Sequence, residues 1–235
     1  NCDTSFCSFP DSVLCSSDPV MSPDSVFPQS GFFRTPSAGL ALDSLGNLDP
    51  GTSNPGIHEI QYVALDSCAD TFRVFVQILA TGNPSFAYPD TLYCVPGPDP
   101  FPILTGDSGG VFSGPPGLVL DSVTGQIFAG LSTVGSYLIG YAVDSLCPDS
   151  STFAISIQNR GDASFLYPDT AYCTNEADPG PIVLGDAGGR FSAGAGLVVD
   201  SLSGVVDLSQ SAAGSFMVQY RSPGPCEDTT FFMLT

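Results

Sequence analysis

The stretch Gly117–Phe128, Gly-Leu-Val-Leu-Asp-Ser-Val-Thr-Gly-Gln-Ile-Phe, places a polar turn between two short apolar runs. The first run ends at Asp121 and Ser122, residue types that favour turns. Gly125 can take the left-handed backbone conformation that closes a type I turn with a bulge. The stretch therefore predicts a β-hairpin.

The first half of this hairpin recurs twice elsewhere in the chain. Gly-Leu-Ala-Leu-Asp-Ser occupies 39–44, and Gly-Leu-Val-Val-Asp-Ser occupies 196–201. The cysteines keep a matching period, because two series of three each recur at one constant interval: Cys15, Cys94 and Cys173, and Cys68, Cys147 and Cys226. Such self-similarity indicates three copies of one unit, each of about 79 residues. We predict three domains, at 1–79, 80–158 and 159–235.

Within each copy the apolar residues alternate as they do in β-strands. In the second copy Tyr137, Ile139 and Tyr141 fall on one face of a strand, and the same positions elsewhere hold Phe216, Val218 and Tyr220, and His58, Ile60 and Tyr62. A closing strand is expected after the last cysteine of each copy, at Phe72–Leu79, Phe153–Gln158 and Phe231–Thr235. About seven short strands per copy predict an all-β fold of three tandem Ig-like β-sandwich domains. Short connections such as 158–162 predict that the domains form a rod-like row.

The composition supports this fold class and excludes several functions. With 26 Gly and 21 Pro scattered through 235 residues, long helices are disfavoured, and 43% hydrophobic residues argue against disorder. The five cations are all arginine and stand against 24 Asp+Glu, a net charge of -19. A surface this acidic repels nucleic acid, and the absence of lysine excludes lysine chemistry. No apolar run is long enough for membrane insertion, so we expect a soluble protein.

The cysteines predict disulfides and therefore an oxidising, extracellular setting. Pairing within each copy joins Cys15 to Cys68, Cys94 to Cys147, and Cys173 to Cys226, with an identical separation in all three pairs. A loop of about 53 residues is worth about 4 kcal/mol in the chain-entropy description. Pairing between neighbours, Cys68 with Cys94 and Cys147 with Cys173, stays open as an alternative.

The N-terminal pair, Cys2 and Cys7, departs from the repeat. Cys7 occupies the place that Phe86 and Phe165 hold in the other copies, a core position. We predict a local Cys2 to Cys7 bridge that pins the terminus. A crosslink from one of them to a neighbouring subunit stays open.

One segment resembles the nucleophile motif of chymotrypsin-like proteases. It is Gly-Asp-Ser-Gly-Gly at 106–110, centred on Ser108. A serine nucleophile needs a histidine base, and the single histidine, His58, falls on a predicted core position of another copy. The third copy carries Ala187 in place of the serine. We therefore predict a glycine-rich turn, no catalytic residues and no enzyme activity.

Repeated aspartates are the remaining candidates for a site. They are Asp11, Asp90 and Asp169, Asp43, Asp121 and Asp200, and Asp107 and Asp186. Carboxylates could bind calcium, but no Asp-x-Asp-x-Asp-Gly cluster occurs, and Asp before Ser or Thr is usual turn chemistry. We predict turns and no cofactor or metal site, with calcium left open. Zinc is excluded by the cysteine spacing and by the presence of only one histidine.

Across nearly all 235 residues the chain resembles the Ig-like repeats of large secreted surface proteins and adhesins of Bacteroidota-type bacteria, and also Ig and cadherin-like modules. The matching residues are Phe86 and Tyr88, Tyr93-Cys94, Gly110 and Phe112, Gly117-Leu118, Thr124-Gly125, Ile127, Gly135, Tyr137 and Cys147. The resemblance implies a structural or adhesive role outside the cell, and it transfers no catalytic residues.

These observations predict a secreted, non-catalytic structural protein: the subunit of an extracellular filament, sheath or adhesin stalk that self-associates head to tail into a homopolymer. The alternative is a cell-surface module that binds a ligand or carbohydrate through loops at one end of a sandwich.

Overall fold

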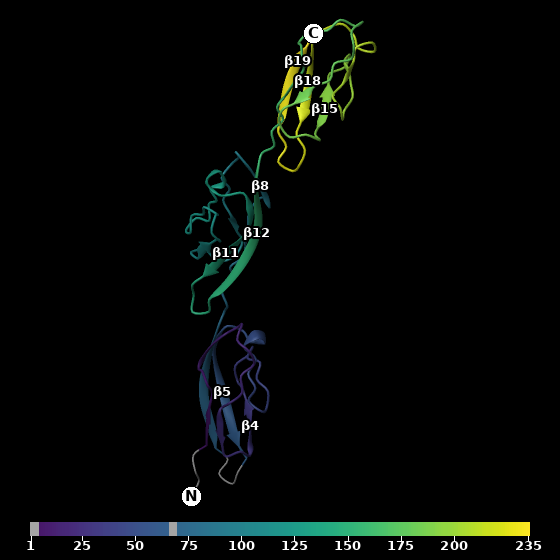
Figure 1. Cartoon of the computed structure of the whole chain (residues 1–235). Coiled ribbons are helices and arrows are strands. Elements are labelled where there is room, and N and C mark those ends of the chain that lie inside the picture. The colour runs from purple at the N-terminus through teal and green to yellow at the C-terminus, as the bar shows by residue number, and fades with distance from the viewer. Residues whose placement is uncertain (1–4, 66–69) are drawn as a thin grey trace. The chain divides into compact units, whose positions relative to one another are not determined.

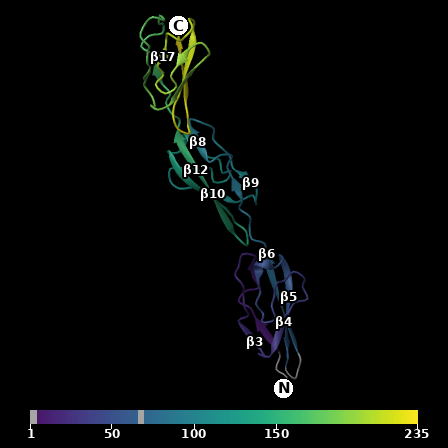
Figure 2. The ribbon, with the colours of Figure 1, turned by 90° about the vertical axis from the view of Figure 1, so that its right-hand side faces the viewer.

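The structure is a computed structural model that describes residues 5–65 and 70–235. It is all-β in the described residues, with tandem β-sandwiches built from short strands (Figures 1 and 2). The predicted fold class is confirmed. Two single-turn 3-10 helices interrupt the strands, η1 (Pro50–Thr52) and η2 (Ala129–Leu131).

The first repeat contains one four-stranded and one two-stranded sheet. The larger sheet has the order β2-β6-β5-β4 and the smaller pairs β1 with β3. The strands are β1 (Phe6–Ser8), β2 (Val13–Cys15), β3 (Ser25–Phe27), β4 (Gly31–Arg34), β5 (Gly56–Ala64) and β6 (Thr71–Leu79). Strand β2 pairs parallel with the end of β6, whereas the other pairs are antiparallel.

The second repeat follows the same plan, with the sheet order β10-β11-β12-β8 and a smaller pair, β7 with β9. Its strands are β7 (Phe86–Ala87), β8 (Leu92–Val95), β9 (Ile103–Leu104), β10 (Val111–Ser113), β11 (Gly135–Val143) and β12 (Asp149–Asn159). Strand β8 again pairs parallel with the end of the closing strand, placing Cys94 opposite Gln158.

The third repeat has the sheet β15-β18-β19 and the pairs β13-β14 and β16-β17. Its strands are β13 (Phe165–Leu166), β14 (Ile182–Val183), β15 (Arg190–Ala193), β16 (Val198–Val199), β17 (Val206–Asp207), β18 (Phe216–Arg221) and β19 (Thr229–Leu234). The segment equivalent to β2 and β8, residues 171–174, is not a strand here.

By their internal contacts the residues group into two compact units, whose division passes through the second repeat. One comprises Asn1–Ala87, Ile103–Ser113 and Gly140–Thr152, and the other comprises Tyr88–Pro102, Gly114–Ile139 and Phe153–Thr235. The domain boundaries predicted near residues 79 and 158 stay a prediction.

The alternating residues form the cores, as predicted. Ile60, Ile139 and Val218 are fully buried, and the tyrosines that follow them two residues later are buried beside them. The smaller sheet of the first repeat packs on the larger one through Cys7, which replaces a core phenylalanine as expected. Burial of these faces is what holds two short sheets together, at about 25 cal/mol per Å² of apolar surface removed from water.

The predicted hairpin is confirmed. Leu120 and Ile127 form a β-bridge, and Gly125 has a φ of 72°, in the left-handed region. Tyr88 closes the turn from inside, because its hydroxyl donates to the Gly125 carbonyl oxygen at 2.5 Å. Tyr167 makes the same bond to Gly204 in the third repeat.

Candidate functional site

Two disulfides join residues of successive repeats, and they correct the predicted pairing. Cys15 is bonded to Cys147, and Cys94 to Cys226, both at a sequence separation of 132 residues. The predicted pairs Cys15–Cys68, Cys94–Cys147 and Cys173–Cys226 are therefore wrong, as is the alternative Cys147–Cys173. The Cys68–Cys94 alternative is excluded too, because Cys94 is bonded to Cys226. Cys68 itself lies outside the described residues.

The closing strand explains why pairing within a repeat fails. Cys94 lies opposite Gln158 near the end of β12, whereas Cys147 precedes the start of that strand. Eleven extended residues separate positions 147 and 158, about 36 Å at 3.3 Å per residue. A disulfide needs Cα atoms about 4.4–6.8 Å apart. The two cysteines of one repeat thus sit at opposite ends of its sandwich.

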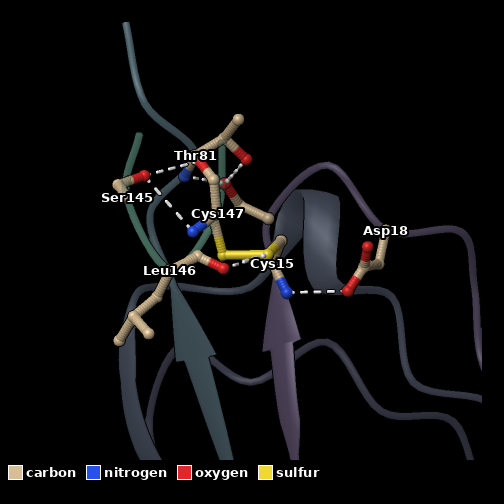
Figure 3. Close-up of a disulfide and its surroundings, with 7 residues drawn as sticks. Cys15, Asp18, Thr81, Ser145, Leu146 and Cys147 are labelled. Atoms are coloured by element: carbon tan, nitrogen blue, oxygen red, sulfur yellow. Dashed lines mark hydrogen bonds between the residues drawn. A yellow bond between two sulfur atoms is a disulfide. The ribbon is translucent and has the colours of Figure 1, made fainter. Parts of the chain in front are cut away.

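The Cys15–Cys147 bridge lies among backbone and hydroxyl contacts (Figure 3). The Cys15 N–H donates to the Asp18 carboxylate at 2.7 Å. Ser16 and Thr81 share a hydroxyl bond of 3.0 Å, and the Thr81 N–H donates to the Ser16 hydroxyl. These bonds fix the chain that leaves β6 beside the cysteine that ends β2.

Hydrogen bonds also surround the Cys94–Cys226 bridge, and here they join backbone groups. The Arg160 N–H donates to the Val95 carbonyl at 2.8 Å, beside Cys94. The Gly161 N–H donates to the Cys226 carbonyl at 2.8 Å, as the Gly82 N–H donates to that of Cys147 at 3.0 Å. Each bridge is thus accompanied by a hydrogen bond from the connecting segment to the same cysteine.

The N-terminal prediction is also corrected. Cys7 carries a free thiol buried in the core, so the predicted Cys2 to Cys7 bridge is not formed. Burial raises the pKa of this thiol to about 11. Cys2 lies outside the described residues, and the crosslink alternative remains a prediction for that residue alone.

Cys173 is a free and exposed thiol. By the repeat period it is the counterpart of Cys15 and Cys94, both of which are bonded. Sequence reasoning paired it with Cys226 and so missed that it is unpaired.

The repeated aspartates of the hairpins form turns, as predicted. The Asp121 carboxylate accepts the N–H groups of Val123 and Thr124, and Asp200 accepts those of Leu202 and Ser203. These bonds, above all the one from the residue three positions on, lower the pKa of both carboxyls. Asp43 repeats this pattern with Asn47, whose bonds lower its pKa in the same way.

Across the part of the chain that the structure describes, no three His, Cys, Asp or Glu side chains cluster as metal ligands do. Asp107 and Asp186 accept backbone N–H groups of Asn83 and Asp162. The carboxylates of Asp11, Asp90 and Asp169 are exposed. Calcium binding stays open for a titration to test.

The protease-like segment is anchored as a turn. The Tyr141 hydroxyl donates to the Asp107 carbonyl and accepts the Gly110 N–H, which holds exposed Ser108 at the tip. His58 is buried, with Nε2 2.8 Å from the Asn54 carbonyl oxygen, and its Nδ1 has no hydrogen-bond partner within residues 5–65 and 70–235. Neither ring nitrogen is thus engaged as the base of a serine nucleophile.

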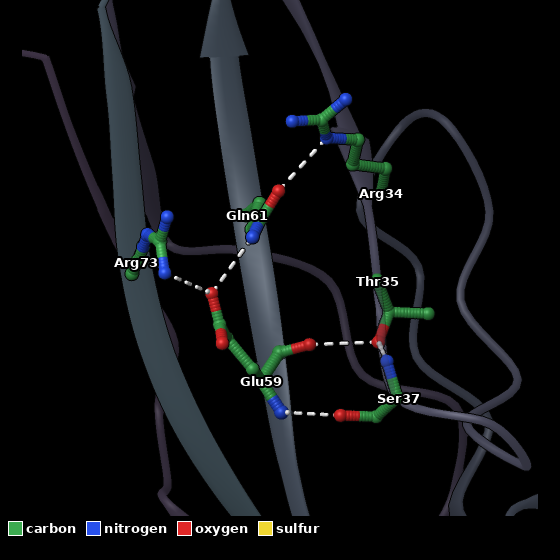
Figure 4. A network of polar contacts seen from close by, with 6 residues as sticks. All are labelled: Arg34, Thr35, Ser37, Glu59, Gln61 and Arg73. Carbon is green, nitrogen blue, oxygen red and sulfur yellow. Dashed lines mark hydrogen bonds and ion pairs between the residues drawn. The ribbon is translucent and has the colours of Figure 1, made fainter.

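Polar residues cover the outer face of β5 in the first repeat (Figure 4). The Glu59 carboxylate accepts from Gln61 at 2.7 Å and pairs with Arg73 at 3.2 Å, while Gln61 in turn accepts from Arg34 at 2.8 Å. Two of the five cations are therefore already engaged with acceptors, and a third, Arg221, pairs with Glu227.

Within the described ranges, no helix has the length and apolar character needed to cross a bilayer. No family model matches the chain, and no curated protein sequence does.

Solved cadherin ectodomains align with the chain at low similarity. A protocadherin gammaB7 EC3-6 cis-dimer structure aligns over 96% of this chain and 72% of its own, at 13% identity and a TM-score of 0.29. Human CDH23 EC21-23 aligns over 97% and 99%, at 9% identity and 0.30. Drosophila N-cadherin EC1-4 aligns over 94% and 72%, at 9% identity and 0.30. Scores this low support no argument about function, and the resemblance to Bacteroidota-type surface repeats stays a prediction.

Proposed function

We propose that this chain is a non-catalytic structural module of an extracellular filament, sheath or adhesin stalk, and that its disulfides limit how far it extends under tension. The observation that supports the proposal is the interleaving of the two bridges. Cys94 lies between Cys15 and Cys147 in sequence, and Cys147 lies between Cys94 and Cys226. The two disulfides suit an oxidising setting outside the cell.

Interleaving shortens the covalent path through the chain. From Cys15 the path crosses to Cys147, returns along the backbone to Cys94, and crosses to Cys226. Only the segment of about 53 residues between Cys94 and Cys147 lies on this path, which limits its extension to about 190 Å at 3.6 Å per residue. Without bridges, the roughly 211 residues from Cys15 to Cys226 reach about 760 Å. A module that resists extension in this way suits a stalk or filament.

Single-molecule stretching tests the proposal on the full chain held by its ends. The oxidised protein is expected to stop extending at about 190 Å between Cys15 and Cys226, beyond the contribution of the terminal segments. A Cys15→Ser, Cys147→Ser variant leaves one of the two described bridges, and the path of about 79 residues through it reaches about 280 Å. Full reduction of the chain restores about 760 Å. Extension of the oxidised protein well past its expected limit, at forces that leave disulfides intact, contradicts the proposal.

We further propose that the protein is secreted and associates with copies of itself. The alternating sheet faces support this, because they leave large apolar side chains exposed: Phe75 at 58%, Phe231 at 54% and Met233 at 57%. Electron microscopy of native material tests the association, and only dispersed single chains there contradict it.

A further inference from the structure

The third repeat differs from the other two at one end, where its second-strand cysteine is unbonded. Cys15 ends β2 and Cys94 lies in β8, and each is bonded to a cysteine of the following repeat. Their counterpart Cys173 is free and exposed. The sequence separation of 132 that both bridges share would place the partner of Cys173 in a repeat after the third.

A second observation lies beside this thiol. An apolar pocket of about 300 Å³ opens at the end of the third repeat, lined in part by Tyr172, Leu197, Leu208, Phe216 and Leu234. In the other two repeats, the closing strand continues through the equivalent position, beside β2 or β8. In those repeats the space holds an isoleucine, because Ile78 faces Leu14 and Ile157 faces Tyr93 across parallel strands.

The side chains that line this pocket are more exposed than their counterparts in the other two repeats. Ile78 and Ile157 are 1% and 0% exposed, and the residues opposite them, Leu14 and Tyr93, are buried. Tyr172, the third member of that series, is only half-buried. Phe216 is half-buried as well, although its counterpart Tyr137 is buried. An aliphatic side chain in the pocket would cover both rings.

The backbone is already positioned to extend the strand. The Thr235 N–H donates to the Thr170 carbonyl at 2.8 Å, as Ser156 does to Thr91 at 2.8 Å. The Tyr172 N–H then donates to the Thr235 carbonyl at 3.0 Å. The parallel ladder has begun, and a residue added after Thr235 would enter the pocket.

We propose that this end of the third repeat is an acceptor for one more repeat of the same kind. An aliphatic residue at the start of the connection to that repeat fills the pocket. A cysteine that follows it at the spacing between Ile157 and Cys226 bonds to Cys173. The bond forms as the two thiols give up two protons and two electrons to a small-molecule disulfide, which leaves as two thiols. The inference does not depend on the role under tension proposed above.

The test extends the full chain. A copy of residues 157–235 is appended directly after Thr235, so that the copied Ile157 is the first added residue. Peptide mapping without reduction is expected to recover a bridge between Cys173 and the copied Cys226. Cys173 is expected to lose at least ten-fold in its rate of alkylation by iodoacetamide. The matched control replaces only the copied Cys226 with serine, which restores fast alkylation.

A smaller variant tests the pocket without relying on the folding of an added repeat. Adding only Ile-Gln-Asn after Thr235 is expected to raise the Tm of the third repeat by about 4 °C or more. Adding Asp-Gln-Asn is expected to give no such rise, because a carboxylate is not accommodated in an apolar pocket.

Three results overturn the proposal. One is an extended chain whose Cys173 stays reactive or bonds elsewhere. The second is an equal Tm for the Ile and Asp extensions. The third is a disulfide-linked dimer of the unextended chain through Cys173, because it would make a second copy the partner.

Discussion

Gly82 donates its backbone N–H to the carbonyl oxygen of Cys147 at 3.0 Å. The segment that follows the first repeat is thus hydrogen-bonded to the same cysteine that forms the disulfide with Cys15. The contact leaves no room for a side chain. A Cβ on Gly82 would lie 2.4 Å from Val143 Cγ2, and one on Gly161, its counterpart, 2.3 Å from the Ser222 hydroxyl. A side chain at either connection would therefore displace a neighbouring side chain.

We expect Gly82→Ala and Gly161→Ala to destabilise the protein by about 1–3 kcal/mol, the usual cost of overpacking. Urea unfolding measures the change. Gly194→Ala is the matched control, because a Cβ there meets no atom within 4 Å. Equal stability of Gly82→Ala and Gly194→Ala would show that the connection adapts at no cost.

The two described free thiols should differ sharply in reactivity. Cys173 is exposed, whereas Cys7 is buried with a pKa raised to about 11. Since the thiolate is the reactive form, Cys7 has few reactive molecules at pH 8 and little access to reagent. Iodoacetamide in the folded state should modify Cys173 first, as read by peptide mass spectrometry. Comparable rates at both sites would contradict the burial of Cys7.

Because the Cys7 thiol is buried, we also expect the folded protein to lose stability at high pH. Its pKa is about 11 when folded, against 9.0 as the reference, so the unfolded thiol ionises first. The stability that this shift contributes is complete below pH 9 and is lost as the pH rises through 11, a change of up to about 2 kcal/mol. Cys7→Val should remove that part of the alkaline slope. Chemical unfolding at pH 8 and pH 11 measures it, and parallel slopes for both proteins would rule it out.

The tyrosines that close the hairpins should contribute to stability through single bonds. Tyr88→Phe removes the donor to the Gly125 carbonyl and leaves that acceptor inside the fold. We expect a loss of about 1–2 kcal/mol in the free energy of unfolding. Tyr172→Phe is a suitable control, because Tyr172 is half-buried and water can replace its hydroxyl at the Asp169 N–H. A smaller loss for Tyr88→Phe than for the control would be inconsistent with this role.

Much of the fold could be predicted from the sequence, because the residues that determine each turn and strand lie close together in the chain. The hairpin at Gly117–Phe128 has its turn residues and both strands within one short stretch, and Gly125 has the backbone conformation that its place predicted. The alternation around Ile139 likewise marked the buried face. The repeat period extended these inferences from one copy to the others.

The disulfide partners could not be obtained in this way, because the period alone is ambiguous. The bonded cysteines lie 132 residues apart, which is one repeat length more than the separation predicted for pairs within a repeat. Both pairings therefore fit the same periodic positions of the cysteines. The parallel pairing of β8 with the end of β12 decides between them. It places Cys94 about 36 Å along the strand from Cys147. The sequence carried no direct signal for that pairing.

Self-association should strengthen as ionic strength rises. A net charge of -19 makes copies repel one another, whereas exposed side chains such as Phe231 and Met233 supply apolar contact. The Debye length falls from about 30 Å at 0.01 M salt to about 3 Å at 1 M, so salt removes the repulsion and leaves the apolar attraction. Sedimentation velocity should therefore show larger species at high salt, and Phe231→Ser should reduce them, while Ser150→Thr on an exposed position should not. Dissociation of assemblies as salt is added would mean that ion pairs between copies, rather than apolar contacts, hold them together.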